Sequence, residues 1–131
     1  MYPRLVVDLK KLRSNLDACA KIVKEDGGCS LMIVSKGLCA DPEMARMVAD
    51  HPAVEFMADS RVANIKTYAA EARAKGKKTV LLRLPMACET AEVVKYVDLS
   101  FNSELATIRL LNEEAGKIGV KHNILLMIDM G

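Results

Sequence analysis

The sequence predicts an α/β domain in which helices alternate with the strands of a parallel sheet. Short runs rich in Val, Ile, Leu and Met alternate along the chain with longer stretches rich in Ala, Lys and Glu, which is the pattern of repeated strand–helix units. Two of the short runs, Leu31–Val34 and Leu125–Ile128, are apolar at every position, so both faces of these strands are covered. Helices must therefore flank the sheet.

The expected elements follow one another in order along the chain. We expect strands at the short apolar runs, near Arg4–Asp8, Leu31–Ser35, Val54–Ala58, Thr79–Leu84, Val97–Phe101 and Asn123–Asp129. We expect helices at the stretches between them, near Leu9–Glu25, Pro42–Ala49, Arg61–Ala74, Ala91–Tyr96 and Glu104–Ile118.

Capping residues support these helix boundaries. Asp8 precedes the first helix, Asp41 precedes a proline at the start of the second, and Asn102-Ser103-Glu104 opens the last. We therefore interpret Asp41 as a helix cap and not as a general base. Glycines that tolerate a left-handed backbone close several helices, at Gly27-Gly28, Gly76 and Gly119.

Composition narrows the class of protein. The 131 residues carry 19 Lys+Arg and 17 Asp+Glu, a net charge of +2 with both signs mixed, and 51% are hydrophobic. Disordered chains contain far less apolar sequence, and nucleic-acid binders concentrate positive charge, so we expect neither. No uncharged run approaches the ~18 apolar residues of a membrane helix, and we expect a cytoplasmic protein without membrane partners. The four cysteines lack close pairing, so we expect neither disulfides nor a zinc site.

Two architectures fit this pattern of strands and helices. One is a five-stranded doubly wound sheet, which needs about this many residues, and the other is roughly the first half of a TIM-type (β/α)₈ barrel, which needs about 250 for closure. Size favours the doubly wound sheet. The last strand runs into Asp129-Met130-Gly131 with no helix behind it, so we also expect a chain cut where another loop should begin.

In either architecture, reactive groups belong at the carboxyl ends of the strands, where the loops converge. Lys36 follows a strand that is apolar throughout, and burial there would desolvate its ammonium and free an amine for Schiff-base chemistry, although most lysines at strand ends reach water. Arg83 is positioned either to clamp a carboxylate or phosphate or to pair with Asp59.

Other reactive side chains have simpler explanations. His51 and His122 have no metal-ligand spacing around them, so we expect solvated histidines and no metal. Cys39 is expected to be a buried thiol. No Gly-rich phosphate loop of the dinucleotide or nucleotide type is present, which argues against both ligand classes.

Several collinear strings resemble a known family. They are Met1-Tyr2-Pro3, Leu5-Val6-Val7-Asp8-Leu9-Lys10-Lys11-Leu12-Arg13-Ser14-Asn15-Leu16, Val34-Ser35-Lys36, Ala58-Asp59-Ser60-Arg61, Leu82-Arg83-Leu84-Pro85-Met86, Ser100-Phe101-Asn102-Ser103-Glu104 and Met127-Ile128-Asp129-Met130-Gly131. Together they resemble the N-terminal half of the alanine racemase barrel family, the fold-type III pyridoxal-phosphate enzymes, and within it the ornithine racemase-like branch. On this resemblance, residues 1–131 are the N-terminal part of a barrel domain truncated after Gly131.

The resemblance implies a function and a site. It implies an amino-acid racemase that depends on pyridoxal 5'-phosphate, with Lys36 forming the internal aldimine and moving the α-proton of a small amino-acid substrate. Asp59, Arg83, Asn102 and Ser103 would line the cofactor by their place in the barrel.

The sequence departs from the family at one motif. Alanine racemases follow the lysine with Ala-Asn-Ala-Tyr-Gly, whereas Gly37-Leu38-Cys39-Ala40 stands here, so ornithine or a similar amino acid is the expected substrate. The phosphate-binding loops and second base of the family are not among these residues, and the chain alone is expected to be inactive. The alternative is a non-catalytic βα domain that holds pyridoxal phosphate or another small molecule.

A half-barrel would leave two sheet edges and one face without partners. The edge strands would be Leu31–Ser35 and Asn123–Asp129, and the inner face would carry Ile33, Met57, Leu81 and Met127 or their immediate neighbours. Association between copies would cover both, so we expect a homo-oligomer, most simply a dimer joined through open edges or open faces.

Overall fold

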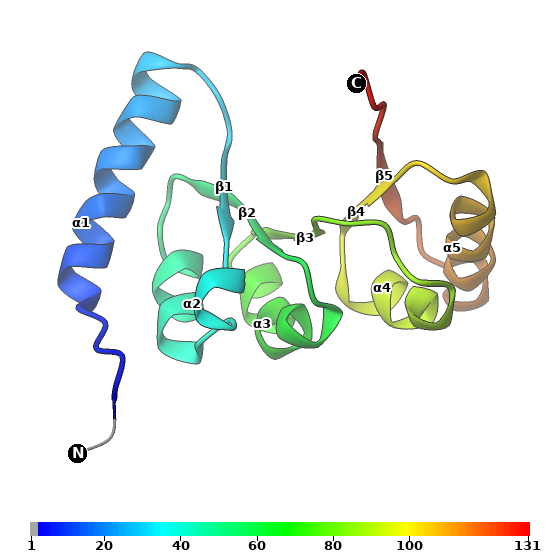
Figure 1. Cartoon of the computed structure of the whole chain (residues 1–131), viewed down its shortest axis with the longest axis horizontal. Coiled ribbons are helices and arrows are strands. Elements are labelled where there is room, and N and C mark those ends of the chain that lie inside the picture. Colours follow the sequence, from blue (N-terminus) through cyan, green and yellow to red (C-terminus); the bar gives the residue numbers. More distant parts are fainter. Residues whose placement is uncertain (1–2) are drawn as a thin grey trace.

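The computed structural model describes residues 3–131 and contains a sheet of parallel strands with a helix after each strand except the last (Figure 1). Met1 and Tyr2, which belong to the first string quoted above, lie outside the described residues. The strands are β1 (Leu31–Val34), β2 (Val54–Asp59), β3 (Lys78–Leu81), β4 (Leu99–Asn102) and β5 (Asn123–Leu126). The α-helices are α1 (Leu9–Ala20), α2 (Pro42–Ala49), α3 (Val62–Ala74), α4 (Thr90–Tyr96) and α5 (Leu105–Ile118).

Shorter helical pieces complete the chain. A π-helical turn at Lys21–Asp26 continues α1, and 3₁₀ turns follow β1 at Lys36–Leu38 and precede α4 at Ala87–Glu89. The boundaries of α2 agree with the expected ones because its ends are set locally: Asp41 accepts hydrogen bonds from the N–H groups of Glu43 and Met44, and proline occupies the first turn. At the other end of the chain, Gly119 closes α5 with a left-handed backbone, φ 66°.

The strand order distinguishes between the two expected architectures. The strands lie side by side in sequence order, β1-β2-β3-β4-β5, and every neighbouring pair is parallel. Helices α2 to α5 all lie on one side of the strands (Figure 1). A doubly wound sheet reverses its strand order and carries helices on both faces, so that alternative is wrong. Sequential order with helices outside is the arrangement of a barrel, and this sheet is the open, first half of one.

The main core fills the space between the sheet and the helices. It includes Met57, Ile65, Leu81, Val93 and Leu111, each at most 1% exposed. Hydrophobic burial is the dominant favourable term in folding. The burial of these side chains holds α2 to α5 against the strands.

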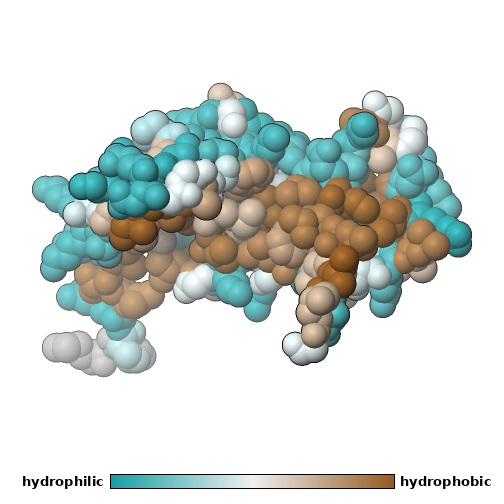
Figure 2. Space-filling model, turned by 90° about the horizontal axis from the view of Figure 1, so that it is seen from above, coloured by the Kyte–Doolittle hydropathy of each residue, from teal (hydrophilic) through white to brown (hydrophobic). Residues whose placement is uncertain are grey.

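The opposite face of the sheet is apolar and open. Of the residues expected there, Ile33, Met57 and Leu81 lie instead on the helix-facing side. Their strand neighbours Val34, Ala58 and Val80 take the opposite side by alternation, and of these Ala58 and Val80, in the middle of the sheet, are 0% exposed. Figure 2, which looks onto this side, shows a continuous apolar band across the strands. Val34, Leu125 and Met127 are 41%, 43% and 42% exposed. The band runs from one edge strand, β1, to the other, β5, as expected for a half-barrel.

Two expected elements differ in the structure. The expected strand Arg4–Asp8 is wrong: residues 3–8 have no strand pairing, and Leu5 and Val6 are 77% and 74% exposed. A strand needs a neighbour for its N–H and C=O groups, and none of the described strands lies beside this segment. The expected cap at Asn102–Glu104 is also wrong, because α5 begins at Leu105 without a side-chain cap.

Helix α1 contacts the rest of the molecule through Leu16 and Ala20, which belong to the core, and through a hydrogen bond to a buried histidine. His51 is 4% exposed, so the expectation of a solvated residue is wrong. Its Nε2 donates to Asp17 Oδ1 at 2.9 Å, and its Nδ1 accepts from the Ala53 N–H at 3.2 Å. The hydrogen bond from His51 lowers the pKa of Asp17, with Arg13 contributing to the same shift. Asp17 thus joins α1 to the loop that enters β2.

We predict that Asp17→Ala loosens α1 alone. Removing the carboxylate leaves buried His51 Nε2 without its acceptor, so amide hydrogen exchange should accelerate along Leu9–Ala20 and stay unchanged in β2 and β3. Because the folded pKa of Asp17 is depressed, its contribution is present at neutral pH and disappears as the pH falls through that value. Asp50→Ala, which removes the surface partner of Lys75, is the control and should leave α1 unchanged. Equal exchange in α1 for wild type and Asp17→Ala would contradict this account.

Candidate active site

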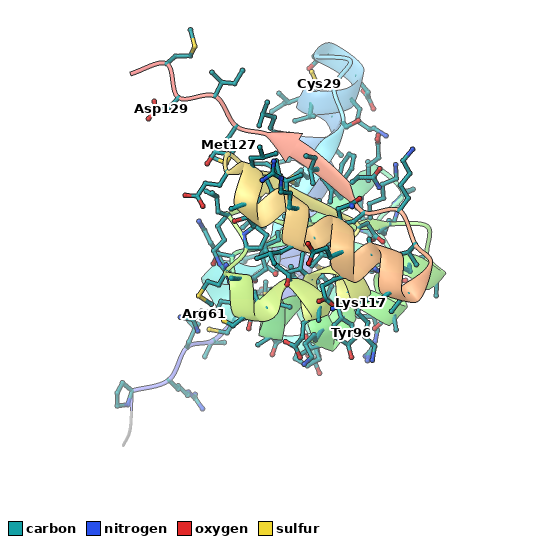
Figure 3. All side chains as sticks on the ribbon, turned by 90° about the vertical axis from the view of Figure 1, so that its right-hand side faces the viewer. Cys29, Arg61, Tyr96, Lys117, Met127 and Asp129 are labelled. Carbon is teal, nitrogen blue, oxygen red and sulfur yellow. The ribbon has the colours of Figure 1, made fainter. Side chains whose placement is uncertain are left out.

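The carboxyl ends of all five strands lie at one edge of the sheet, since every pair is parallel. Lys36 follows β1, Arg61 follows β2, Arg83 follows β3 and Ser103 follows β4. Figure 3 shows Arg61, Met127 and Asp129 toward one side of the molecule and Tyr96 and Lys117, at helix carboxyl ends, toward the other. The strand-end residues selected from the sequence therefore share one edge.

Lys36 offers an unoccupied amine at this edge. It is the first residue of the 3₁₀ turn Lys36–Leu38, and its side chain is exposed. Among residues 3–131 its Nζ has no hydrogen-bond or ion-pair partner. The described residues therefore do not bury the Lys36 ammonium, and the desolvation considered from the sequence is not found. The amine is therefore accessible at the edge of the sheet.

The loop after Lys36 is tightly turned. Cys39 and Ala40 have φ angles of 51° and 55°, in the left-handed region that L residues other than glycine rarely adopt. The N–H of Ala40 donates back to the Ser35 carbonyl at 3.2 Å, which closes the turn. Cys39 is exposed, so the expected buried thiol is wrong; all four cysteines are free and exposed.

Asp59 ends β2 as a buried and fully hydrogen-bonded carboxylate. It is 0% exposed. Its Oδ2 accepts from Ser35 Oγ at 2.6 Å, and its Oδ1 accepts from the Arg61 N–H at 2.9 Å. Asn64 Nδ2 lies 3.2 Å from both oxygens. These donors leave Asp59 without a free acceptor position.

Tyr68 lies beside this cluster on α3. Its hydroxyl is 3.5 Å from Ser35 Oγ. Burial raises the pKa of Tyr68 to about 12, opposed by the hydrogen bond with Ser35 and reinforced by the nearby charge of Asp59. Tyr68 is therefore a neutral phenol at physiological pH, and Asp59 carries the only charge in this group of side chains.

Arg83 binds Glu89 and not Asp59, so of the two alternatives that the sequence left open for Arg83, the ion pair with Asp59 is wrong. Its guanidinium makes a two-point contact with the Glu89 carboxylate, Nη2 lying 3.0 Å from Oε2, and Nε donates to the Ser60 carbonyl at 2.6 Å. Burial alone would raise the pKa of Glu89, but the hydrogen bonds from Arg83 and the Met86 N–H lower it overall. The cation at the end of β3 is thus already paired within the chain.

Polar side chains of β4 and a histidine that precedes β5 form a second cluster. Ser100 and Asn102 are both 0% exposed, and Asn102 Nδ2 donates to the Ser100 carbonyl and Oγ, each at 3.0 Å. His122 Nε2 lies 2.8 Å from Ser100 Oγ. Burial lowers the pKa of His122, opposed by the Val97 carbonyl and the Asp98 charge, so the expected solvated histidine is wrong. Ser103 is exposed at the strand end.

Sequence reasoning missed four of the side chains that build this edge. Asn64 and Tyr68 are four residues apart on α3 and share a helix face, a signal that points to a common neighbour but does not identify it. Glu89 and Ser35 carry no recognisable spacing, and their partners become visible only once the strands are aligned.

Two kinds of feature, a membrane-spanning helix and a cluster of metal ligands, are absent from residues 3–131. No helix there combines the length and apolar character needed to cross a bilayer. The same residues contain no group of three or more His, Cys, Asp and Glu side chains able to hold a metal ion.

Almost the whole chain matches a known protein family. Residues 7–131 match the alanine racemase N-terminal domain. An ornithine racemase of Acetoanaerobium sticklandii is 40% identical over 133 residues, covering 100% of this chain and 35% of that protein. A lysine racemase of Thermotoga maritima is 28% identical over 131 residues, covering 100% of this chain and 36% of that protein. The chain thus spans about a third of the length of these relatives.

Solved structures share the fold. An alanine racemase of Clostridium difficile in complex with cycloserine superposes with a TM-score of 0.75 at 22% identity, over 98% of this chain and 35% of that one. PipY of Synechococcus elongatus, solved with PLP bound, gives a TM-score of 0.72 at 17% identity, over 92% of this chain and 55% of that one. At these identities the likeness establishes the half-barrel fold.

Proposed function

This chain belongs to the alanine racemase N-terminal domain family, and from that premise we propose that the protein carrying it is a pyridoxal-phosphate-dependent racemase of ornithine or a similar basic amino acid. The two relatives named above act, by their names, on ornithine and on lysine, which both carry a side-chain amine. The observation that carries the proposal is the exposed Lys36 amine at the carboxyl edge of the sheet, free of any partner among the described residues.

Of the groups needed to hold pyridoxal phosphate, the described residues offer the amine that would bind its aldehyde. Pyridoxal phosphate supplies an aldehyde that reacts with an amine and a ring that withdraws electrons from the α-carbon of an amino acid. Lys36 Nζ has the exposure and freedom to bind the aldehyde. When uncharged, the same nitrogen would exchange the α-proton on one face of the substrate, and the second base proposed below would serve the opposite face.

The remaining proposed contacts differ in their accessibility. Ser103 is exposed at the edge and is the most accessible of the four proposed lining residues. Arg83 is held by Glu89, and Asp59 and Asn102 are fully buried, so we propose that these three support the edge from behind. A holder for the phosphate and a second base are proposed to lie outside residues 3–131.

A non-catalytic domain that holds pyridoxal phosphate is the second candidate. One similar structure is PipY with PLP bound, whose name states no reaction. This alternative shares the Lys36 attachment and differs in predicting no turnover with any amino acid.

We predict that Lys36→Ala in the full-length protein abolishes covalent attachment of pyridoxal phosphate and racemase turnover. The substitution removes the amine that binds the aldehyde and moves the proton. Attachment is measured by borohydride reduction followed by peptide mass spectrometry, and turnover by chiral chromatography with ornithine and lysine. Lys10→Ala, which removes an exposed lysine of α1, is the control and should change neither. Full turnover in Lys36→Ala would refute the catalytic role, while attachment at Lys36 without turnover of any amino acid would favour the second candidate.

We predict that the 131-residue chain alone binds pyridoxal phosphate weakly and racemises nothing measurable. The phosphate normally provides much of the orientation of this cofactor, and the strand-end cation Arg83 is already paired with Glu89. Titration followed by absorbance should give no stoichiometric binding at micromolar concentration. Tight binding at one molecule per chain would mean that these residues hold the phosphate after all.

Self-association is proposed for the isolated chain, with a second copy as the occupant of the open sheet face. The apolar band reaches both edge strands, and exposed apolar surfaces of this kind are uncommon in soluble monomers (Figure 2). A second copy presents the same apolar band and the same unpaired edges, so a two-fold dimer would cover both.

We predict that the isolated chain sediments as a dimer at micromolar concentration and that Leu125→Lys shifts it toward monomer. Leu125 is 43% exposed on edge strand β5, so a charge there would be buried by association. Leu105→Lys is the matched control, since Leu105 is 61% exposed at the start of α5, outside the open face. A stable wild-type monomer, or an equal shift by both substitutions, would count against an interface on this face.

A further inference from the structure

We propose that Asp59 and Ser35 act together as positioning residues for Lys36, and that Asp59 does so from the helix-facing side of the sheet without touching cofactor or substrate. This inference rests on the proposed function of Lys36 and assigns the residues that hold it. It differs from the role suggested by family resemblance, in which Asp59 lines the cofactor.

The first step of the argument is the saturation of Asp59. Its carboxylate is fully buried and receives hydrogen bonds from Ser35 Oγ, the Arg61 N–H and Asn64 Nδ2. A buried carboxylate needs such donors, because an unpaired charge there is costly. No acceptor position remains for a small molecule. Asp59 can therefore affect Lys36 only by fixing the positions of the groups that donate to it.

Ser35 is the donor that leads to Lys36. Its N–H donates to the Ala58 carbonyl at 2.8 Å, which continues the ladder between β1 and β2. Its Oγ binds Asp59 at 2.6 Å. Its carbonyl accepts from the N–H groups of Leu38 and Ala40, each at 3.2 Å, which closes the turn that begins at Lys36. Ser35 is thus fixed by the neighbouring strand, by Asp59 and by the turn.

Lys36 depends on these fixed points because its own side chain has none. The backbone of Ser35 sets where the Lys36 Cα lies and in which direction its side chain leaves the sheet. A reactive amine must be held to within a fraction of an ångström of its productive geometry, and residues behind it supply that restraint. The short hydrogen bond from Ser35 to Asp59 is the side-chain restraint nearest to Lys36 in the sequence.

The chemistry of the pocket explains why a carboxylate stands at position 59. Every polar group that faces Asp59 is a neutral donor: the Ser35 hydroxyl, the Asn64 amide and the Arg61 N–H, with the neutral phenol of Tyr68 behind Ser35. An acceptor with two oxygens satisfies all of them. Asn64 Nδ2 lies 3.2 Å from both carboxylate oxygens, so an amide at position 59 would set its N–H₂ group against this donor in either orientation. If that N–H₂ group faced Ser35, the Ser35 hydroxyl would become an acceptor and its own proton would turn to the Ala58 carbonyl, 3.2 Å away. The site at the start of α3 also favours negative charge.

The test compares Asp59→Asn and Ser35→Ala with Ser35→Thr, which keeps the hydroxyl, and with Thr79→Val. Thr79 is a matched control because it is 0% exposed and its Oγ1 donates to Asp98 Oδ2 at 2.9 Å, in a partly buried cluster where β3 begins. For each full-length variant, three quantities are measured: the melting temperature, the rate of pyridoxal phosphate attachment at Lys36 by reduction and mass spectrometry, and amide exchange at Leu38 and Ala40, whose N–H groups bind the Ser35 carbonyl.

We expect Asp59→Asn and Ser35→Ala to slow attachment about tenfold, in the range found when an outer-shell partner is removed from a reactive group, and to speed exchange at Leu38 and Ala40. Ser35→Thr should restore attachment. Thr79→Val should lower the melting temperature by a similar amount with attachment within about twofold of wild type. Equal attachment rates in all variants of equal stability would overturn the positioning role.

The same measurements distinguish a failure of the proposed function of Lys36 from a failure of the positioning role of Asp59. If the wild-type protein attaches no pyridoxal phosphate at Lys36, that function is wrong, whereas selective loss of protection at Leu38 and Ala40 in Asp59→Asn would still support the restraint on the Lys36 turn. If Asp59→Asn and Thr79→Val give the same exchange at these amides, the positioning role is wrong even where attachment at Lys36 occurs.

Discussion

Each of the first four strands is followed by a helix that returns along the same face of the sheet, and this one-sided return constrains the rest of the structure. It places every strand parallel to its neighbour, so all carboxyl ends meet at one edge. It also buries one face against α2 to α5 and leaves the other apolar and open. The reactive edge and the open face are therefore two results of a single topology.

The polar groups at the carboxyl edge divide by burial. Asp59 and Asn102 are fully buried: Asp59 accepts from Ser35 at the end of β1, and Asn102 Nδ2 donates to Ser100 within its own strand, whereas Lys36 and Ser103 are exposed. Arg83 lies between these groups, partly buried and paired with Glu89. A buried carboxylate costs free energy unless it is satisfied, so the donors around Asp59 fix its position, and such a fixed group is what an exposed reactive side chain requires behind it. The edge thus combines a buried, hydrogen-bonded carboxylate with an exposed amine.

Local signals in the sequence predicted most of the secondary structure, and contacts between distant segments account for what they missed. Helix α2 was predictable because Asp41, Pro42 and the apolar spacing act within one segment. The strand expected at Arg4–Asp8 failed because pairing needs a neighbour that local sequence does not reveal. His51 and Asp59 depend on partners 34 and 24 residues away, so neither their burial nor their bonds could be predicted. Position alone did not distinguish Lys36 from other strand-end lysines; the family resemblance did.

A crystal structure of the full-length protein with pyridoxal phosphate tests the central claim most directly, because it shows both sides of the sheet at once. The account predicts continuous density between the cofactor and Lys36 Nζ at the carboxyl edge, with Asp59 still bonded to Ser35 and Asn64 on the helix-facing side. Cofactor bound away from Lys36, or an Asp59 carboxylate in direct contact with it, would contradict the account.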